Sequence, residues 1–200
     1  VLFRSDALST PSNVYGMFSN ADLEFEDAID KDGQAYPLTQ GTFIKYLESD
    51  DRELRASAFR NVYKAYGAHN NTLGATLAGE VKKNVFNART HHYRSARERA
   101  LSNNHIPEAV YDNLIKTVHK YLPLLHRYTK LRQELLGLDD LKMYDLYTPL
   151  VKDVKFEMPY EEAKSWMLKA LEPMGEEYLN VVKKGLDNRW VDVYERSEEH

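Results

Sequence analysis

The sequence predicts a mainly α-helical protein, built of long antiparallel helices with one short β-hairpin. From residue 42 onward, apolar side chains recur at steps of three and four residues, which is the spacing of one face of an α-helix. Before that point, an Asp-Gly pair separates two short alternating runs, which is typical of a hairpin turn. Hydrophobic residues make up 42% of the 200 residues, which is enough for a sizeable core and too many for a disordered chain.

In residues 7–38, the sequence predicts only the hairpin. Residues 7–21 are turn-rich and weakly patterned, so no element is predicted there. Residues 25–30 and 34–38 flank Lys31-Asp32-Gly33, where glycine accepts the positive φ of a tight turn. Pro37 cannot donate a backbone hydrogen bond, so the second strand should lie at an edge or end there.

The following segment predicts a short helix, a second helix and then a longer one. Residues 42–47 favour the short helix, and Ser49 or Asp50 is the predicted N-cap of the next, with Asp50 and Glu53 at the spacing of a capping box. The longer helix is expected to reach about Leu101. The apolar stripes of these two helices are Leu54, Ala58, Val62 and Tyr66, and then Leu73, Leu77, Val81 and Val85.

Another long helix is expected to start near Asn103 or Asn104, with Pro107 in its first turn. Pro123 should bend this helix, because proline removes one backbone hydrogen bond and crowds the preceding turn. Gly137 is the expected C-terminal stop. The apolar positions of the helix are Val110, Leu114, Val118, Tyr121, Leu125 and Tyr128.

The last part of the chain alternates between helix signals and breaks. Residues 142–149 favour β structure and end in an X-Pro step that disfavours helix. Residues 159–171 favour a helix opened by a proline, and residues 175–184 favour a last helix after the break at Pro173.

The composition excludes several classes of protein. The formal net charge is −4, so the whole chain offers no cationic field for nucleic acid or for an anionic membrane surface. Without cysteine there are no disulfides, no thiol nucleophiles and no Cys-ligated zinc. No apolar run approaches the roughly 20 residues that span a bilayer, and no secretory signal is present. A soluble cytoplasmic protein is therefore expected.

No residues have the spacing of a catalytic or metal centre. His91 and His92 are adjacent, so on a helix their side chains point about 100° apart. His119 and His126 share a face but lie roughly 10 Å from each other, which is too far for one ion. No His-Glu-x-x-His, phosphate-binding loop or nucleophile elbow occurs. No catalytic and no metal-binding residue is therefore assigned.

Residues 89–99 form a basic cluster with Tyr93 inside it. Such a cluster could contact phosphate or an acidic partner. Alternatively, the cations simply favour the negative end of the helix dipole, and the net charge supports this interpretation over nucleic-acid binding. A self-standing helical adaptor that binds an acidic partner through this basic helix face is the alternative function.

Short motifs occur in a recognisable order along the chain. Residues 127–150 hold an Arg-Tyr pair, a Leu-Gly-Leu and a Tyr-Asp-x-Tyr-x-Pro-Leu element, and residues 189–194 are Arg-Trp-Val-Asp-Val-Tyr. In this order, over essentially all of residues 6–195, the chain resembles the oligoendopeptidase F family of zinc metallopeptidases, relatives of the thimet oligopeptidases. Supporting stretches are residues 51–66, 96–104, 110–118 and 160–163.

The resemblance implies a fragment of a zincin-type helical peptidase that closes around a peptide channel. In the family, zinc is held by a His-Glu-x-x-His motif and a further Glu that follow the Arg-Trp-x-Asp-Val-Tyr segment, so these ligands would lie beyond Glu195. The implied reaction is hydrolysis of oligopeptide substrates by a zinc-activated water. This chain by itself is expected to be inactive, and helices that pack on the missing remainder of the chain should expose apolar faces.

Tyr144, Asp145 and Tyr147, which lie within residues 127–150, are the candidate substrate-contacting residues. A structural role for them is favoured over substrate contact. The step into Pro149 alone demands a change from helical to extended backbone at this point.

The two ends of the chain look foreign to the rest. Residues 1–5 and 196–200 resemble translated adapter DNA and are expected to be non-native. By the family resemblance, residues 6–66 correspond to the end of an N-terminal helical region that includes the hairpin. Residues 67–195 correspond to the start of the peptidase catalytic domain.

Overall fold

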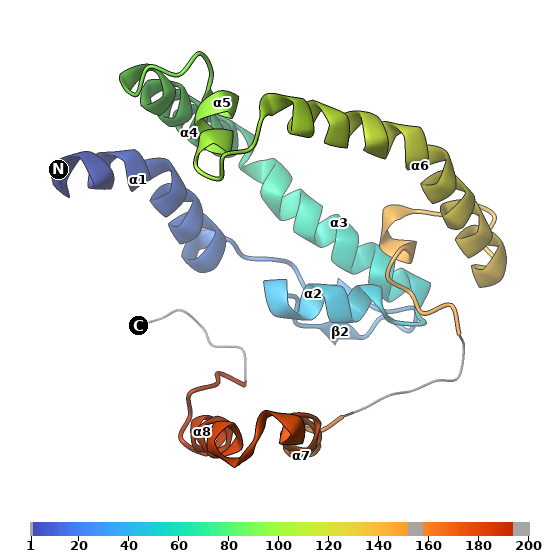
Figure 1. Ribbon diagram of the computed structural model, residues 1–200. Coiled ribbons are helices and arrows are strands. Elements are labelled where there is room, and N and C mark those ends of the chain that lie inside the picture. The colour runs from blue at the N-terminus through green and yellow to red at the C-terminus, as the bar shows by residue number, and fades with distance from the viewer. Residues whose placement is uncertain (1, 152–157, 194–200) are drawn as a thin grey trace. The chain divides into compact units, whose positions relative to one another are not determined.

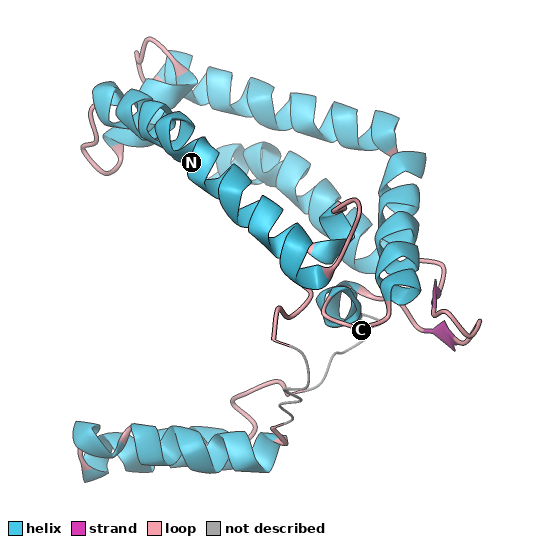
Figure 2. Ribbon diagram, turned by 90° about the vertical axis from the view of Figure 1, so that its right-hand side faces the viewer, coloured by secondary structure: helices cyan, strands magenta, loops and turns pink. Residues whose placement is uncertain are grey.

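The computed structural model describes residues 2–151 and 158–193, and the chain divides into two compact units at residue 150. In the first unit, α3 (Arg52–Ala68) and α4 (Asn70–Thr90) run in one direction and α6 (Glu108–Leu136) returns in the opposite one (Figure 1). Figure 2 shows one small two-stranded hairpin beside these helices. The predicted fold of long antiparallel helices with one short hairpin is therefore confirmed.

A helix begins the chain where the sequence predicted no element. α1 (Leu2–Met17) leads into a π-helical turn, η1 (Phe18–Asp22). α1 packs along α4, where a Cβ atom on Gly79 would lie 3.3 Å from the Cγ atom of Pro11. The segment has a weak apolar pattern, and packing against another helix rather than its own periodicity selects the helical state.

The hairpin forms at the predicted turn. β1 (Ala28–Ile29) pairs antiparallel with β2 (Ala35–Tyr36), and Gly33 in the turn has a φ of 81°. The free edge of β1 docks on α3: the Ile29 N–H donates to the hydroxyl of Ser57, which donates to the Ile29 carbonyl, both at 2.7 Å. The backbone groups on the unpaired edge of this very short strand are therefore satisfied by a side chain of the helix.

The next two helices start at caps that differ from the predicted ones. α2 (Gln40–Leu47) starts two residues before the predicted position, because Thr39 and Thr42 form a capping box. α3 is capped by Asp51, whose Oδ1 accepts hydrogen bonds from the N–H groups of Glu53 (2.9 Å) and Leu54 (3.3 Å). The prediction of Ser49 or Asp50 as the cap was therefore wrong.

The predicted stripe of α3 forms the core of the first unit. Leu54, Ala58 and Val62 are buried together with Ala28 of β1 and Leu38. Partly buried aromatic residues surround this group: Phe25, Tyr36, Phe43, Tyr46 and Tyr66. The core thus lies where the hairpin and α2 cover one face of α3.

The single long helix predicted to reach Leu101 is divided in two. α4 ends at Thr90, and α5 (Ala96–Ser102) starts after a turn in which His92 has a φ of 61°. Ser95 caps α5 by accepting a hydrogen bond from the Glu98 N–H (3.0 Å). The Ser95 and Glu98 pair has the spacing of a helix start, and this signal was missed within the apolar pattern.

The predicted long helix forms as α6, but it begins at Glu108 with Pro107 as its N-cap, so the expected start near Asn103 or Asn104 was wrong; Asn103 instead ends α5. Gly137 ends it with a φ of 67°, as expected of a left-handed C-cap. Pro123 lies inside α6, which is visibly bent in Figure 2.

Residues 142–149 are not extended as predicted. They form η2 (Met143–Asp145), a single 3-10 turn, followed by bends, and the hairpin strands are the only ones among residues 2–151 and 158–193. A carboxylate oxygen of Asp145 accepts a hydrogen bond from the Lys142 N–H (2.9 Å). The prediction was wrong because this side chain to backbone hydrogen bond stabilises a turn in competition with a strand.

The second unit is a helical pair. α7 (Tyr160–Ala170) and α8 (Glu176–Asp187) are joined by η3 (Glu172–Met174), which agrees with the predicted helices and the break at Pro173. The Nζ atom of Lys164 lies 2.5 Å from a carboxylate oxygen of Asp187 and links the two helices.

Two further expectations concern the ends of the chain and membranes. Residues 2–5 lie in α1, whereas residues 196–200 lie outside the described residues. Among the described helices, none combines the length and the apolar character needed to cross a membrane.

The cap of α3 can be tested by substitution. Asp51→Ala should lower the free energy of unfolding by about 1 kcal/mol, because the N–H groups of Glu53 and Leu54 at the start of α3, and that of Lys31, lose their acceptor. Asp50→Ala is the matched control and should change it by less than about 0.5 kcal/mol, since Asp50 is exposed. Urea denaturation measures both values, and a larger effect at Asp50 than at Asp51 would contradict the observed cap.

Candidate functional site

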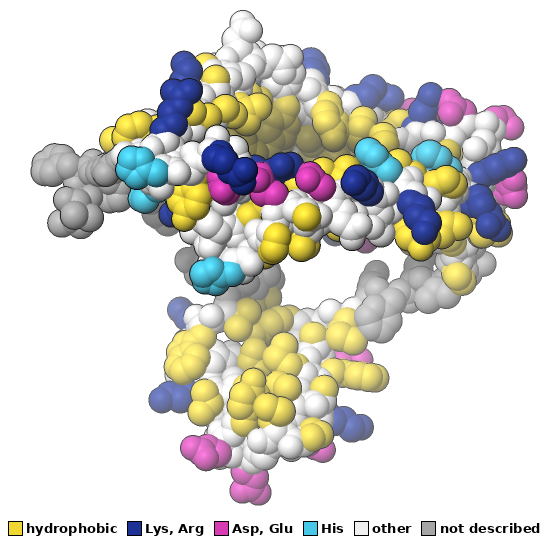
Figure 3. Space-filling view, turned by 45° about the horizontal axis from the view of Figure 1, so that its top comes forward, with side chains coloured by type: hydrophobic (Ala, Val, Ile, Leu, Met, Phe, Trp, Pro, Cys, Tyr) yellow, Lys and Arg dark blue, Asp and Glu magenta, His cyan; other side chains and the backbone are white. Residues whose placement is uncertain are grey.

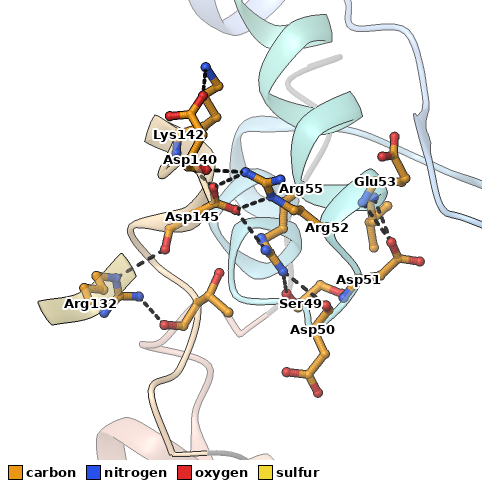
Figure 4. Close-up of polar contacts among 12 residues, drawn as sticks. Ser49, Asp50, Asp51, Arg52, Glu53, Arg55, Arg132, Asp140, Lys142 and Asp145 are labelled. Carbon is orange, nitrogen blue, oxygen red and sulfur yellow. Dashed lines mark hydrogen bonds and ion pairs between the residues drawn. The ribbon is translucent and has the colours of Figure 1, made fainter. Parts of the chain in front are cut away.

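The stretch with the candidate substrate-contacting residues is organised by one buried carboxylate. The Asp145 side chain is completely inaccessible to solvent. Its Oδ1 atom accepts hydrogen bonds from Arg52 Nε (3.2 Å) and Arg55 Nη2 (2.9 Å), and its Oδ2 atom accepts one from Arg52 Nη2 (2.9 Å) (Figure 4). Both arginines belong to the first turn of α3, so this carboxylate is attached to the start of that helix.

A third arginine attaches the same stretch to α6. Arg132 is buried, and its Nε donates to the backbone carbonyl of Asp145 at 3.2 Å, while its Nη2 donates to the carbonyl of Thr148. Arg52, Arg55, Arg132 and Asp145 are called the Asp145 cluster below. The cluster connects the N-terminus of α3, η2 and the C-terminal part of α6 (Figure 4).

The guanidinium of Arg55 is also held by backbone oxygens. Its Nη1 donates to the carbonyl groups of Ser49 (2.7 Å) and Asp50 (3.2 Å), which lie just before α3. Both the Arg55 and the Asp145 side chains are at most 4% exposed. Arg55 therefore joins the start of α3 to η2 with little solvent screening, where a charge-assisted hydrogen bond is strongest.

The cluster determines the protonation state of its carboxyl. Burial alone raises the pKa of Asp145, but the hydrogen bonds from Arg52 and Arg55 outweigh burial and hold the pKa below its ordinary value of 3.8. Asp145 is therefore an ionised acceptor near neutral pH and is not suited to act as a general acid there.

The three candidate residues have different surroundings. Asp145 is enclosed by the arginines and is completely buried, although the extended backbone that was the reason to expect a structural role does not form here. Tyr144 is half-buried, with its ring centroid 5.9 Å from that of Phe59 and 5.5 Å from the Arg52 guanidinium carbon. Tyr147 is 53% exposed. Substrate contact by these residues stays a prediction, and among the three Tyr147 is the accessible one.

The three arginines of the cluster were not predicted from the sequence. Arg132 lies four residues after Tyr128, in step with the apolar stripe of α6, and an arginine at a stripe position is a signal of a buried cation that needs an acceptor. Arg55 gives no such signal, because it lies one residue after Leu54 and thus about 100° around the helix from the stripe of α3. The identity of that acceptor was out of reach, because Asp145 is 90 residues from Arg55 in sequence.

The described residues bring no metal-ligand set together. Among residues 2–151 and 158–193, no three His, Asp or Glu side chains lie close enough to hold one ion. His91 is engaged locally, with its Nδ1 atom 2.8 Å from the carbonyl oxygen of Asn87.

Two arginines of the basic cluster of residues 89–99 form ion pairs with nearby acids. Arg97 binds Glu108 (2.7 Å) and Asp112 (2.9 Å) on α6, and Arg94 binds Glu98 (3.1 Å) and Glu108 (3.2 Å). These pairs connect the start of α5 to the first turns of α6.

Comparison with known proteins identifies relatives of the chain. Residues 45–198 match peptidase family M3. The chain is 56% identical to oligopeptidase PepF of Bacillus subtilis over 96% of its own length and 28% of that protein. It is 44% identical to the group B oligopeptidase PepB of Streptococcus agalactiae, over 95% of the chain and 31% of that protein.

A solved structure shares the fold. The crystal structure of oligoendopeptidase-F from Enterococcus faecium matches with a TM-score of 0.72 at 42% sequence identity, over 91% of this chain and 34% of that one. The chain therefore spans about a third of the length of the relatives that it matches.

Removing the buried carboxylate should destabilise the first unit strongly. Asp145→Asn leaves the guanidinium of Arg55 buried without its counter-charge, so the free energy of unfolding should fall by about 3–5 kcal/mol. Asp139→Asn makes the same chemical change at an exposed position and should have an effect below about 0.5 kcal/mol. Chemical denaturation followed by circular dichroism measures both, and equal effects would contradict the proposed importance of the cluster.

The same carboxyl should make stability depend on acid pH. Its pKa is lower in the folded chain than in the unfolded chain, so its contribution is complete above about pH 4 and is lost as the pH falls through the folded-state pKa. The stability difference between the wild type and Asp145→Asn should therefore shrink with acidification. An NMR titration of the Asp145 carboxyl carbon checks the pKa directly, and a midpoint above those of exposed aspartates would refute the prediction.

Proposed function

The chain belongs to peptidase family M3, and from this membership we propose that its parent protein is a zinc metalloendopeptidase that hydrolyses short peptides. A cytoplasmic location of the parent is part of the same proposal. The 56% identity to oligopeptidase PepF over nearly the whole chain is the observation that carries it. Since the chain spans 28% of that relative, the activity is proposed for a longer protein.

The metal is proposed to be held outside the described residues. The residues present do not fit a zinc site, because no three suitable side chains converge among residues 2–151 and 158–193. We propose that a His-Glu-x-x-His motif and a further Glu follow residue 195 in the parent, where the zinc would activate water. The 200-residue chain by itself is accordingly proposed to be inactive.

The proposed contribution of this chain is structural support for the peptidase. The Asp145 cluster fastens the end of α6 to the start of α3 through four hydrogen-bonded connections to Asp145, three to its carboxylate and one to its carbonyl. We also propose that residues 6–66 belong to the N-terminal helical region and residues 67–195 to the start of the catalytic domain. Tyr147 is the proposed substrate contact, because its side chain is exposed next to the cluster.

No observation favours the alternative of an adaptor for acidic partners. Two of the four arginines in residues 89–99, Arg94 and Arg97, already form ion pairs with Glu98, Glu108 and Asp112.

The proposed activity can be tested on the full-length reading frame that contains this chain. The parent protein should cleave an internally quenched oligopeptide, and a zinc chelator should abolish the cleavage, which added zinc restores. The 200-residue chain should release no fluorescence under the same conditions, with or without zinc. A parent that cleaves equally well with chelator would refute the metal mechanism, and zinc-dependent turnover by the short chain would refute the proposed position of the ligands.

A further inference from the structure

α6 contains many apolar residues, yet none of their side chains is buried. All 29 residues of the helix are described, and Arg132 is the one among them with a buried side chain. The helix is held near its two ends: Arg97 of α5 pairs with Glu108 and Asp112 at its start, and Arg132 joins the Asp145 cluster near its end. Polar contacts thus position α6, while its apolar side chains remain outside the buried core.

The exposed apolar side chains of α6 follow a regular pattern. Six of them alternate at steps of three and four residues, and each is between 42% and 59% exposed. This spacing places them along one seam of the helix and is the spacing with which two helices pack at a shallow crossing angle. The residues of this α6 seam are Tyr111, Leu114, Val118, Tyr121, Leu125 and Tyr128.

The residues around the seam distinguish an apolar side of α6 from a charged side. Val110, Ile115 and Leu124 flank the seam and are themselves 41–54% exposed, so the apolar face is wider than the seam. At 100° per residue, Lys116 lies on the side of the helix opposite the seam, and Figure 3 shows basic and His side chains along the outer side of the first unit. A helix with one charged side and one wide apolar side is patterned for burial of the apolar side.

We propose that the α6 seam is an internal interface of the parent peptidase, covered by a helix that lies outside residues 1–200. The inference rests on the proposed function, which makes the chain part of a longer protein. About two thirds of the length of the matched relatives lies outside this chain, so a covering segment is available within one polypeptide.

A second copy of the chain fits the seam less well. Helices of separate chains select their partners through charged residues that flank the apolar seam. On α6 none of those flanking positions is charged; they carry Val110, Ile115, Thr117, Leu122, Leu124 and Thr129. Such a face resembles the interior of one folded protein, in which the partner is already present in the same chain.

Cysteine labelling tests the covering of the seam. The chain has no cysteine, so Leu125→Cys on the seam and Lys116→Cys on the opposite side introduce single thiols at two exposed positions of α6. In the 200-residue chain both thiols should react with a maleimide. In the full-length parent, labelling at Lys116→Cys should persist and labelling at Leu125→Cys should be lost, as mass spectrometry of the labelled peptides would show.

Each other outcome overturns the proposal. Equal labelling of the two positions in the parent means that the seam is open. Protection of Leu125→Cys that disappears on dilution assigns the seam to a second copy. Protection that requires vesicles of anionic phospholipid, or added oligopeptide, assigns it to a membrane surface or to substrate. The hydrolysis assay on the wild-type parent is independent, so loss of the proposed activity and failure of this inference can be told apart.

Discussion

The structure depends on keeping one carboxylate ionised where water cannot reach it. A buried charge is stable only when opposite charges and hydrogen bonds replace its water. Arg52 and Arg55 provide these for the side chain of Asp145, and Arg132 binds the carbonyl of the same residue. Because these arginines come from α3 and α6, the turn that carries Asp145 takes the conformation in which all of them reach it.

Apart from this cluster, apolar burial is local. The apolar core lies between the hairpin, α2 and α3, whereas the longer helices α4 and α6 expose side chains such as Leu77 and Leu114 at 66% and 59%. The first unit is therefore held together by hydrogen bonds and ion pairs at the ends of its helices as much as by a common apolar core. Such an arrangement suits a segment that packs against further chain, in agreement with the third of the relatives' length that it spans.

Family membership and proposed chemistry concern different parts of the protein. The match to peptidase family M3 covers residues 45–198, which include the Asp145 cluster and α6. In residues 127–150, the most specific stretch of the resemblance, the most enclosed side chain is that of Asp145, which has a structural role in the cluster. The motifs of a family can thus contain residues that hold the fold together as well as residues that take part in the reaction.

The sequence by itself determined the elements whose signals are local. The hairpin follows from Asp32-Gly33, the end of α6 from Gly137, and the face of α3 from the four-residue steps of Leu54, Ala58 and Val62. Local patterns failed where contacts between distant residues decide. α1 exists through its packing on α4, and the turn at 143–145, together with the whole Asp145 cluster, requires partners up to 93 residues away. Periodicity predicts which side of a helix seeks burial, but only the tertiary structure decides which charges meet there, because that choice depends on distances between segments that no local pattern encodes.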